Sequence, residues 1–396
     1  MTKDEFITSF NKYVMGTYNR IPVVLVRGKG ALLWDSEGKE YLDFLAGIAV
    51  CALGHAHPKV VQAIQEQAAR LMHVSNIYYI EPQEKLARLL VKHSFAEKVF
   101  FCNSGAEANE AAIKLARKYA YTHFHGRRFE IITMRDSFHG RTLTTVAATG
   151  QEKFQVGFDP LPQGFNYVPY NDIDALEQAI TEQTCAVMVE PIQGEGGIRI
   201  PDEGYLRNLR QICDDRDLLL ILDEVQVGMG RTGTLFAYEQ SGVEPDIMTL
   251  AKAMGNGFPL GAMLTRDHIA EVFEPGSHAS TFGGNPLAMA AGIATLEVLL
   301  DDGILKNVAR QGNYFQKSLR ALAAKHAIIK DVRGRGLMVG VELFGDGIPF
   351  VRKSMERGLL CNCTAGSVLR FVPPLIITAD DVDRAVGILD DVMGGV

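Results

Sequence analysis

Between about residues 97 and 265, short runs of almost uninterrupted apolar residues alternate with segments of helical periodicity. The runs are KVFFC (98–102), EIITM (130–134), CAVMVE (185–190), LLLILDE (218–224), DIMTLA (246–251) and GAMLT (261–265). Predicted helices between them include residues 105–124, 172–182 and 203–216. Strands that are apolar on both faces and are joined through helices form mostly parallel sheets with helices on both sides. This alternation predicts an α/β domain around a mostly parallel central sheet.

The two ends of the chain have a different pattern. Residues 24–44 predict a small antiparallel unit. After about residue 285, long predicted helices precede short strands and a last helix, with expected ranges 286–300, 303–325, 337–343, 358–361, 367–371 and 379–393. This order is typical of an α+β unit, which the opening antiparallel segment can join. We therefore expect an N-terminal segment (1–50), a large domain (51–285) and a C-terminal small domain (286–396), with both chain ends forming the small domain.

Composition excludes several classes of partner. The formal net charge of −7 disfavours a general binder of nucleic acid or of anionic membranes. No stretch has the length and apolarity of a membrane span, and the polar N-terminus lacks a signal-peptide core. The six cysteines have neither a disulfide framework nor metal-binding spacing, and no histidine pair has the HExxH spacing. We expect reduced thiols, no metal and a cytoplasmic location.

The segment after the first apolar run suits a phosphate. Ligands of open α/β sheets bind beyond the carboxyl ends of the strands. Here Ser104, Gly105 and Ala106 open a predicted helix, and free backbone N–H groups at a helix N-terminus bind anions. A capping serine followed by a tight-turn glycine would give the same pattern without a ligand. The segment contains neither a Walker A motif nor GxGxxG, which disfavours a nucleotide.

The segments after the next two runs carry an aromatic ring and charged side chains. Phe138 can stack on a planar ligand, and Arg141 offers two parallel donors to a carboxylate. An aromatic residue that caps the core and a surface arginine are the alternatives. Glu195 lies in the glycine-rich segment EPIQGEGG, where it can hold an arginine or face solvent.

The most informative residues follow the fourth and fifth runs. Asp223 ends a strand that should be buried, where a carboxylate is costly unless a cation meets it. A pyridinium nitrogen is such a cation, with Gln226 close enough for a neighbouring ring substituent, and an internal arginine is the alternative. Lys252 follows the next strand among apolar residues and glycines, where burial favours the neutral amine that Schiff-base chemistry needs. A lysine that reaches the surface is its alternative. Thr281, in STFGGNP, can donate to a phosphate or belong to a turn.

Taken together, these segments resemble the class III aminotransferases, which are pyridoxal 5′-phosphate enzymes of fold type I. The resemblance runs over nearly the whole chain, through YLDFLAGIAVCALGHAHP, NSGAEANE, SFHGR, EPIQGEGG, LDEVQVGMGRTG, LAKAMGNGFP, STFGGNP and LRFVPPL. It implies a homodimer with shared active sites. Within the class, the chain most resembles members that transfer the terminal amino group of N-acetylornithine to 2-oxoglutarate, giving glutamate.

The resemblance implies a role for each matching residue. The cofactor-binding positions match Ser104, Gly105, Ala106, Phe138, Asp223, Gln226, Lys252 and Thr281, with Lys252 as the Schiff-base lysine and Asp223 as the partner of the pyridinium nitrogen. The substrate-binding positions match Tyr18, Arg141, Glu195, Ser280 and Arg370. Ser280 and Thr281 resemble residues that reach across the dimer. Arg370 matches the arginine that binds the second carboxylate of glutamate, and Glu195 matches the glutamate that pairs with it when N-acetylornithine is bound.

Other functions share part of this pattern. Succinylornithine, ornithine δ- and 4-aminobutyrate aminotransferases carry the same motifs. The ornithine enzymes often have an aromatic residue in the segment aligned with Gly47 and Ile48, whereas this chain has small and aliphatic residues there, which favours an acylated substrate. A non-catalytic binding protein on the same scaffold is an alternative from another class, and the presence of both Lys252 and Asp223 argues against it.

Overall fold

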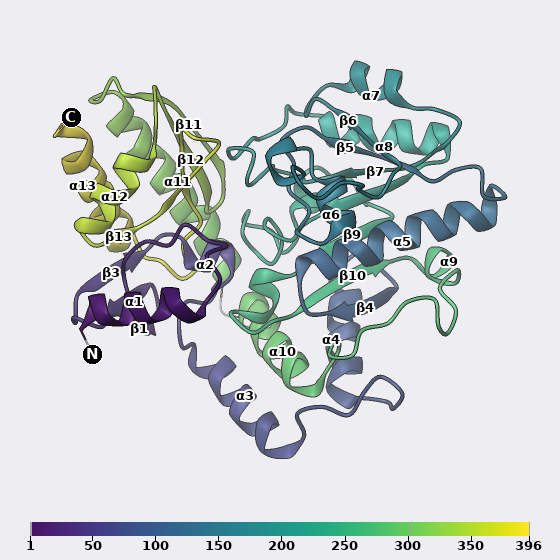
Figure 1. The fold of residues 1–396 in the computed structure, drawn as a ribbon, viewed down its shortest axis with the longest axis horizontal. Helices are drawn as coiled ribbons and strands as arrows, with labels where there is room; N and C mark the ends of the chain where they lie inside the picture. Colours follow the sequence, from purple (N-terminus) through teal and green to yellow (C-terminus); the bar gives the residue numbers. More distant parts are fainter. Residues whose placement is uncertain (1, 302, 396) are drawn as a thin grey trace.

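The computed structural model describes residues 2–301 and 303–395 and shows two groups of elements side by side (Figure 1). The larger group contains a seven-stranded sheet in the order β4-β10-β9-β8-β7-β5-β6. Its strands are β4 (Lys98–Cys102), β5 (Glu130–Met134), β6 (Phe165–Val168), β7 (Thr184–Val189), β8 (Leu219–Asp223), β9 (Ile247–Leu250) and β10 (Gly261–Thr265). β10 is antiparallel to β4 and β9, and the other pairs are parallel. The predicted mostly parallel sheet is confirmed.

Helices cover both faces of this sheet (Figure 1). They include α5 (Gly105–His123), α6 (Leu143–Ala148), α7 (Ile173–Ala179), α8 (Tyr205–Arg216) and α9 (Asp267–Ala270). Along β8, Ile221 packs in the cluster that contains the apolar side of α5, whereas Leu220 and Leu222 pack in the cluster that contains α8. Because successive side chains of a strand point to opposite faces, a strand covered on both faces needs apolar residues at every position.

The two ends of the chain meet in the smaller group. One sheet has the order β1-β2-β3-β13, formed by β1 (Leu25–Lys29), β2 (Leu32–Asp35), β3 (Glu40–Asp43) and β13 (Leu359–Leu360). The other has the order β11-β12-β15-β14, formed by β11 (Ile329–Arg335), β12 (Met338–Leu343), β15 (Val368–Phe371) and β14 (Asn362–Thr364). Helices α11 (Ile304–Ala323), α12 (Ile348–Glu356) and α13 (Ala379–Gly394) pack beside them. The α+β architecture built from both ends agrees with the expected fold class. The boundaries at residues 50 and 285 stay predictions.

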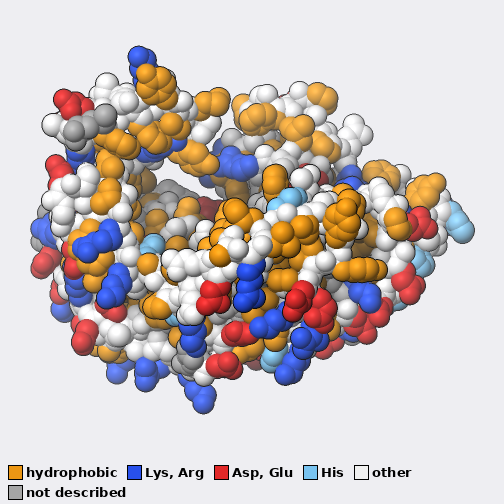
Figure 2. Space-filling view, turned by 90° about the horizontal axis from the view of Figure 1, so that it is seen from below, with side chains coloured by type: hydrophobic (Ala, Val, Ile, Leu, Met, Phe, Trp, Pro, Cys, Tyr) orange, Lys and Arg blue, Asp and Glu red, His pale blue; other side chains and the backbone are white. Residues whose placement is uncertain are grey.

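Helices α1 (Lys3–Tyr13), α3 (Pro58–Arg70), α4 (Glu81–Lys92) and α10 (Pro286–Asp301) complete the main helical elements. α10 packs against α3 and α4, which lie at the lower side of Figure 1. Figure 2 views the molecule from that side and shows hydrophobic side chains gathered on the surface and a hollow between two lobes. In the described part of the chain, no helix combines the length and the apolarity needed to cross a membrane.

Short elements shape the site. They are α2 (Ala46–Ala49) and the 3-10 turns η1 (Glu152–Phe154), η2 (Ala237–Gln240) and η3 (Lys252–Gly255). All four residues of α2 have positive φ, between 51° and 67°, a conformation that Ile48 in particular adopts only under constraint. Oδ1 of Asp43 accepts hydrogen bonds from the backbone N–H groups of Leu45 and Ala46, at 2.9 and 2.8 Å, and so holds the start of this turn.

Candidate active site

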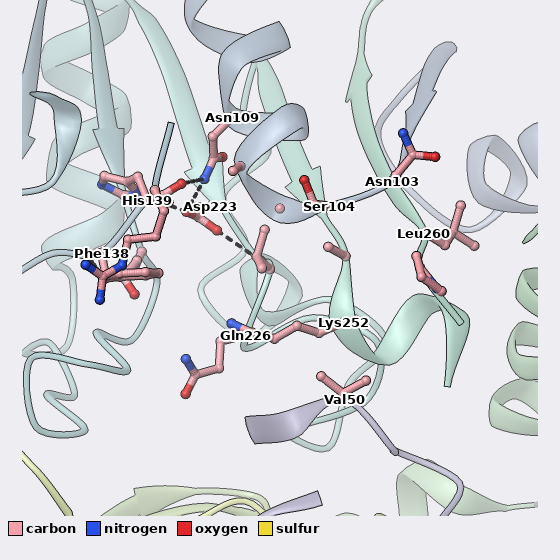
Figure 3. Close-up of a pocket in the computed structure, with 18 of the residues that line it drawn as sticks. Val50, Asn103, Ser104, Asn109, Phe138, His139, Asp223, Gln226, Lys252 and Leu260 are labelled. Atoms are coloured by element: carbon pink, nitrogen blue, oxygen red, sulfur yellow. Dashed lines mark hydrogen bonds and ion pairs between the residues drawn. The ribbon is translucent and has the colours of Figure 1, made fainter. Parts of the chain in front are cut away.

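A pocket of about 380 Å³ lies at the carboxyl ends of the parallel strands (Figure 3). The parallel strands end at one edge of the sheet, so segments far apart in sequence meet there. Of the predicted site residues, those that line it are Ser104, Gly105, Ala106, Phe138, Arg141, Asp223, Gln226 and Lys252. Glu195 and Arg370 lie behind Gln226, whereas Tyr18, Ser280 and Thr281 do not line the pocket of this single chain.

The N-terminus of α5 forms one wall. Ser104 caps the helix, since its Oγ accepts from the N–H of Glu107 at 3.2 Å. The backbone N–H groups of Gly105 and Ala106 have no acceptor among the described residues. A Cβ on Gly105 would lie 2.7 Å from Cγ1 of Val225, so glycine permits the close approach of the loop after β8. This end of the helix therefore presents free donors to an anion.

Asp223 is 4% exposed at the end of β8. Its Oδ2 accepts from Nδ2 of Asn109 and pairs with Nδ1 of His139, each at 2.8 Å (Figure 3). Thr249 donates to Oδ1 of Asn109 at 2.7 Å, which turns the amide nitrogen toward the carboxylate. Oδ1 of Asp223 accepts from the N–H of Val225 at 3.0 Å. Within the described residues no lysine or arginine forms an ion pair with Asp223, so the alternative of an internal arginine is wrong.

No sequence pattern predicted a role for Asn109 or His139. Asn109 lies one helical turn after Gly105 on the buried side of α5, and His139 directly follows Phe138. A buried asparagine within an otherwise apolar helix face was the available signal, because such an amide needs a hydrogen-bond partner. His139 gave no separate signal, because only the fold brings it to Asp223.

Lys252 follows β9 and begins η3 with a φ of 46°. Burial lowers the pKa of its amine, and the neighbouring Arg370 adds to this effect, while Asp223, Glu195 and Glu190 oppose it. No hydrogen bond fixes the amine in the described structure. The side chain is therefore free to act as a nucleophile or as a base at the centre of the pocket.

Arg370 is completely buried on β15 and forms an ion pair with Glu195, with Nη1 and Oε1 2.5 Å apart. Nη1 also donates to Oε1 of Gln226 at 3.2 Å, and Nε donates to Oδ1 of Asn362 at 3.1 Å. Nη2 is buried without a hydrogen-bond partner. The side chain of Glu195 is 27% exposed. The buried guanidinium of Arg370 is thus paired with the carboxylate of Glu195, which lies on a loop and is partly exposed to solvent.

Glu190 is a third acidic residue of the site, and its sequence pattern predicted no role for it. It lines the pocket, and its carboxylate accepts from the backbone N–H groups of Phe138 and Gly194, at 3.2 and 3.3 Å. Burial raises the pKa of Glu190 to about 7. Its two hydrogen bonds connect the loop that carries Phe138 to the loop that carries Glu195.

Arg141 lies at the exposed side of the pocket. Its guanidinium carbon is 4.0 Å from the ring centroid of Phe154 and 5.5 Å from that of Phe138. None of the described carboxylates forms an ion pair with it. Stacking on two rings orients the guanidinium and leaves its donors available to a bound carboxylate.

Three predicted residues lie elsewhere. Ser280 Oγ accepts from the N–H of Gly283 at 2.9 Å and from Nδ2 of Asn103 at 3.3 Å. Together with Thr281 it borders a second, larger cavity, of about 1110 Å³, beside the start of α4. Tyr18 is 74% exposed. None of the three reaches the first pocket within one chain.

Comparisons with known proteins agree on one family. The family model described as aminotransferase class III matches residues 13–393. An acetylornithine aminotransferase of Caldanaerobacter subterraneus subsp. tengcongensis is 57% identical, over 98% of each chain. The structure of an ornithine aminotransferase of Toxoplasma gondii is similar with a TM-score of 0.97 at 37% identity, covering 100% of this chain and 96% of that one. An acetylornithine aminotransferase of Elizabethkingia anophelis gives a TM-score of 0.89 at 35% identity, covering 100% of both chains.

Proposed function

The chain belongs to the class III aminotransferases, and we propose that it transfers the terminal amino group of N-acetylornithine to 2-oxoglutarate. The products are N-acetylglutamate 5-semialdehyde and glutamate. Relatives named acetylornithine aminotransferase that are 50–57% identical over nearly the full length support this choice. The ion pair between Glu195 and Arg370 is the structural observation that carries it, because this reaction needs a cation that is neutralised for one substrate and free for the other.

Pyridoxal 5′-phosphate is the cofactor of this family, and the donors and acceptors of the pocket suit it. The free N–H groups of Gly105 and Ala106 suit the phosphate. Asp223 suits a protonated ring nitrogen, and Phe138 offers a ring for stacking. When bound, the cofactor supplies a carbonyl group that combines with amines and a ring that accepts electrons. The residues that would hold it are Ser104, Gly105, Ala106, Phe138, Asp223, Gln226 and Lys252.

Lys252 is the acid–base residue of this proposal. Its buried amine has a lowered pKa, so a larger fraction is neutral and can take a proton from the substrate carbon. The resulting ammonium, at Nζ, then gives the proton to the cofactor, so that Lys252 acts first as a base and then as an acid. Asp223 keeps the ring nitrogen protonated, and the donors on Asn109 and His139 keep its carboxylate oriented.

Two carboxylate sites explain how one pocket accepts both amino donors. Arg141 binds a carboxylate far from the reacting carbon in either substrate, since its guanidinium has no internal partner. Glutamate has a second carboxylate next to the reacting carbon, which Arg370 binds in place of Glu195. N-acetylornithine has no carboxylate next to the reacting carbon, so Glu195 then remains paired with Arg370 and the buried cation keeps an anionic partner.

A homodimer with shared active sites completes the proposal. Tyr18, Ser280 and Thr281 would serve the pocket of the partner chain, with Thr281 at the phosphate and Ser280 and Tyr18 at the substrate. The exposed apolar side chains Ile77, Tyr79 and Phe282 lie near Ser280 and Thr281, and they support binding of a second copy of the chain to this part of the surface. We also place the enzyme in the cytoplasm, which its six free thiols support.

A comparison of amino donors tests the proposal. The measurement is kcat/KM with 2-oxoglutarate for N-acetylornithine, N-succinylornithine, ornithine, N-succinyl-diaminopimelate and 4-aminobutyrate. We expect N-acetylornithine to give the highest value, because Ile48 and its neighbours offer no partner to a free α-ammonium. A higher value for ornithine would contradict the proposal and would fit the high TM-score to an ornithine aminotransferase.

A further inference from the structure

Arg231, on the loop after β8, is a buried cation that the proposed reaction does not use. It is 1% exposed, and Nε and Nη2 of its guanidinium are buried without a hydrogen-bond partner. Burial lowers the pKa of Arg231, and no carboxylate among the described residues opposes this effect. Because burial of a cation without an anion is costly, the place of Arg231 in the fold needs an explanation.

Nη1 of Arg231 donates two hydrogen bonds to the smaller group of elements. One goes to the carbonyl of Leu337, in the turn between β11 and β12, at 3.0 Å, and the other to the carbonyl of Pro373, just after β15, at 2.5 Å. In return, the N–H of Leu337 donates to the carbonyl of Arg231 at 3.0 Å. Glycine permits this approach, since Gly336 has a φ of 55° and a Cβ on it would lie 2.6 Å from that carbonyl oxygen.

The register of β12 and β15 explains why these two carbonyls take a side-chain donor. The N–H of Leu343 donates to the carbonyl of Ser367 at 2.9 Å, and in an antiparallel pair such a bonded position recurs at every second residue. Three repeats further along this register, Leu337 opposes Pro373. Proline has no N–H to give to the carbonyl opposite, so the ladder ends there. Arg231 supplies the donor that proline lacks.

Arg231 also lies close in sequence to the contact that places Arg370. Nη1 of Arg370 donates to Oε1 of Gln226 at 3.2 Å, which joins β15 to the loop after β8 at the pocket. Arg231 follows Gln226 by five residues and Pro373 follows Arg370 by three, so the hydrogen bond to Pro373 joins the same two segments a second time. Because both connecting segments are short, a shift of Pro373 would move Arg370 relative to the pocket.

We propose that Arg231 is a positioning residue that holds Arg370 where it binds the second carboxylate of glutamate. By joining the end of β15 to the loop after β8, it limits the movement of the guanidinium of Arg370. This inference rests on the proposed function, in which glutamate and 2-oxoglutarate use Arg370 as a carboxylate site. N-acetylornithine depends instead on Arg141, which lies on another segment, between β5 and α6.

The variant Arg231→Met tests the proposal, because methionine occupies part of the same space and donates no hydrogen bond. The cofactor-loaded variant is mixed with glutamate or with N-acetylornithine, and absorbance of the cofactor gives the second-order rate constant of each half-reaction. Both half-reactions start from the same form of the enzyme, so an altered cofactor site affects both. We expect the rate constant for glutamate, divided by that for N-acetylornithine, to fall about tenfold, because Arg370 is no longer held in place.

Two further variants separate positioning from a general loss of stability. Arg231→Lys keeps a buried cation that can donate to the carbonyls, so its ratio should lie closer to that of the wild type than to that of Arg231→Met. Arg210→Met removes an arginine that pairs with Asp246 within the large sheet, at 2.8 Å, and should keep the wild-type ratio. If Arg231→Met does not fold, Arg231→Gln replaces it with the same expected fall, because its shorter side chain also loses both contacts.

The outcomes distinguish this inference from the proposed function. A wild-type ratio in the folded Arg231→Met or Arg231→Gln variant, or an equal fall in Arg231→Lys, would overturn the positioning role. A wild-type enzyme that reacts faster with ornithine than with N-acetylornithine would contradict the proposed function instead. Ornithine then replaces N-acetylornithine in the ratio, and the role of Arg231 is tested in the same way.

Discussion

Among the single residues of the pocket, Asp223 has the most unusual surroundings. It is a buried carboxylate whose side-chain partners are an amide and an imidazole rather than a lysine or an arginine. A buried carboxylate without a strong cation is costly, and it attracts a cation from a ligand. The same residue would be unremarkable in a salt bridge. Because the described residues supply no lysine or arginine to Asp223, its carboxylate is available to the protonated ring nitrogen of the cofactor in the proposed function.

Replacement of Lys252 by alanine is expected to abolish turnover. The variant loses the amine that would move the proton, and nothing else in the described pocket has an amine to replace it. The measurement is steady-state transamination of N-acetylornithine. Lys98→Ala, at a lysine whose side chain is 63% exposed, serves as the control and should retain the wild-type rate. Normal rates from the Lys252 variant would refute its assignment.

Replacement of Asn109 by alanine is expected to weaken binding of pyridoxal 5′-phosphate. Oδ2 of Asp223 then keeps only His139 as a side-chain partner, and the loss of one hydrogen bond to a buried charge corresponds to about a tenfold to hundredfold effect. Titration of the apoenzyme with the cofactor, followed by absorbance, gives the dissociation constant. An unchanged constant would show that Asn109 does not position Asp223.

At the scale of elements, the apolar runs predicted six of the seven strands of the large sheet. β6 was missed because FNYV lies at the edge of the sheet and is only half-buried, so it has no continuous apolar run. The antiparallel direction of β10 was also unpredictable, since an apolar run does not encode direction. The positive φ angles of α2 were not predicted from the sequence either, and Asp43 holds only the start of this turn, through the N–H groups of Leu45 and Ala46.

Glu224 holds η2 against the end of β8 and should make stability depend on pH. Its carboxylate accepts from the N–H groups of Ala237 and Tyr238, each at 2.7 Å, and burial raises its pKa to about 8 from a usual value of 4.5. The folded state therefore holds its proton more tightly, and the stabilisation that this gives is lost as pH rises from about 4.5 to about 8.

Glu224→Gln removes this titration. The variant should be less stable than the wild type near pH 5, because its amide can accept at only one atom, and the difference should shrink or reverse near pH 8. Thermal unfolding of both proteins at the two pH values measures the difference in Tm. A difference in Tm that does not change with pH would contradict the expected role of burial.

At the scale of the whole molecule, the site depends on contacts that no local pattern reveals. Glu195 and Arg370 are 175 positions apart, and β3 pairs with β13 across most of the chain. The position of the pocket could be predicted from the sequence, because the carboxyl ends of parallel strands lie at the same edge of a sheet. The pairing of Glu195 with Arg370 was expected only from the family resemblance, and the partners of Asp223 required the structure.

Mixing of inactive subunits tests the proposed sharing of sites. Lys252→Ala and Thr281→Asp variants should each be inactive, the second because a carboxylate would repel the phosphate. After dissociation and random reassociation, half of the dimers combine both variants, and each of these has one intact site if Thr281 serves the partner. Activity should then recover to about a quarter of the wild-type level. No recovery would place Thr281 and Lys252 in the same site of one chain.

Single-turnover rates of the two half-reactions test directly whether Arg370 exchanges Glu195 for the second carboxylate of glutamate. The cofactor-loaded Glu195→Ala variant is mixed with N-acetylornithine or with glutamate, with Glu203→Ala, at an exposed position, as the control. We predict a change of about tenfold or more in the ratio of the two rates, to the disadvantage of N-acetylornithine, because Arg370 then lacks an anion. A ratio equal to that of the wild type would contradict the account.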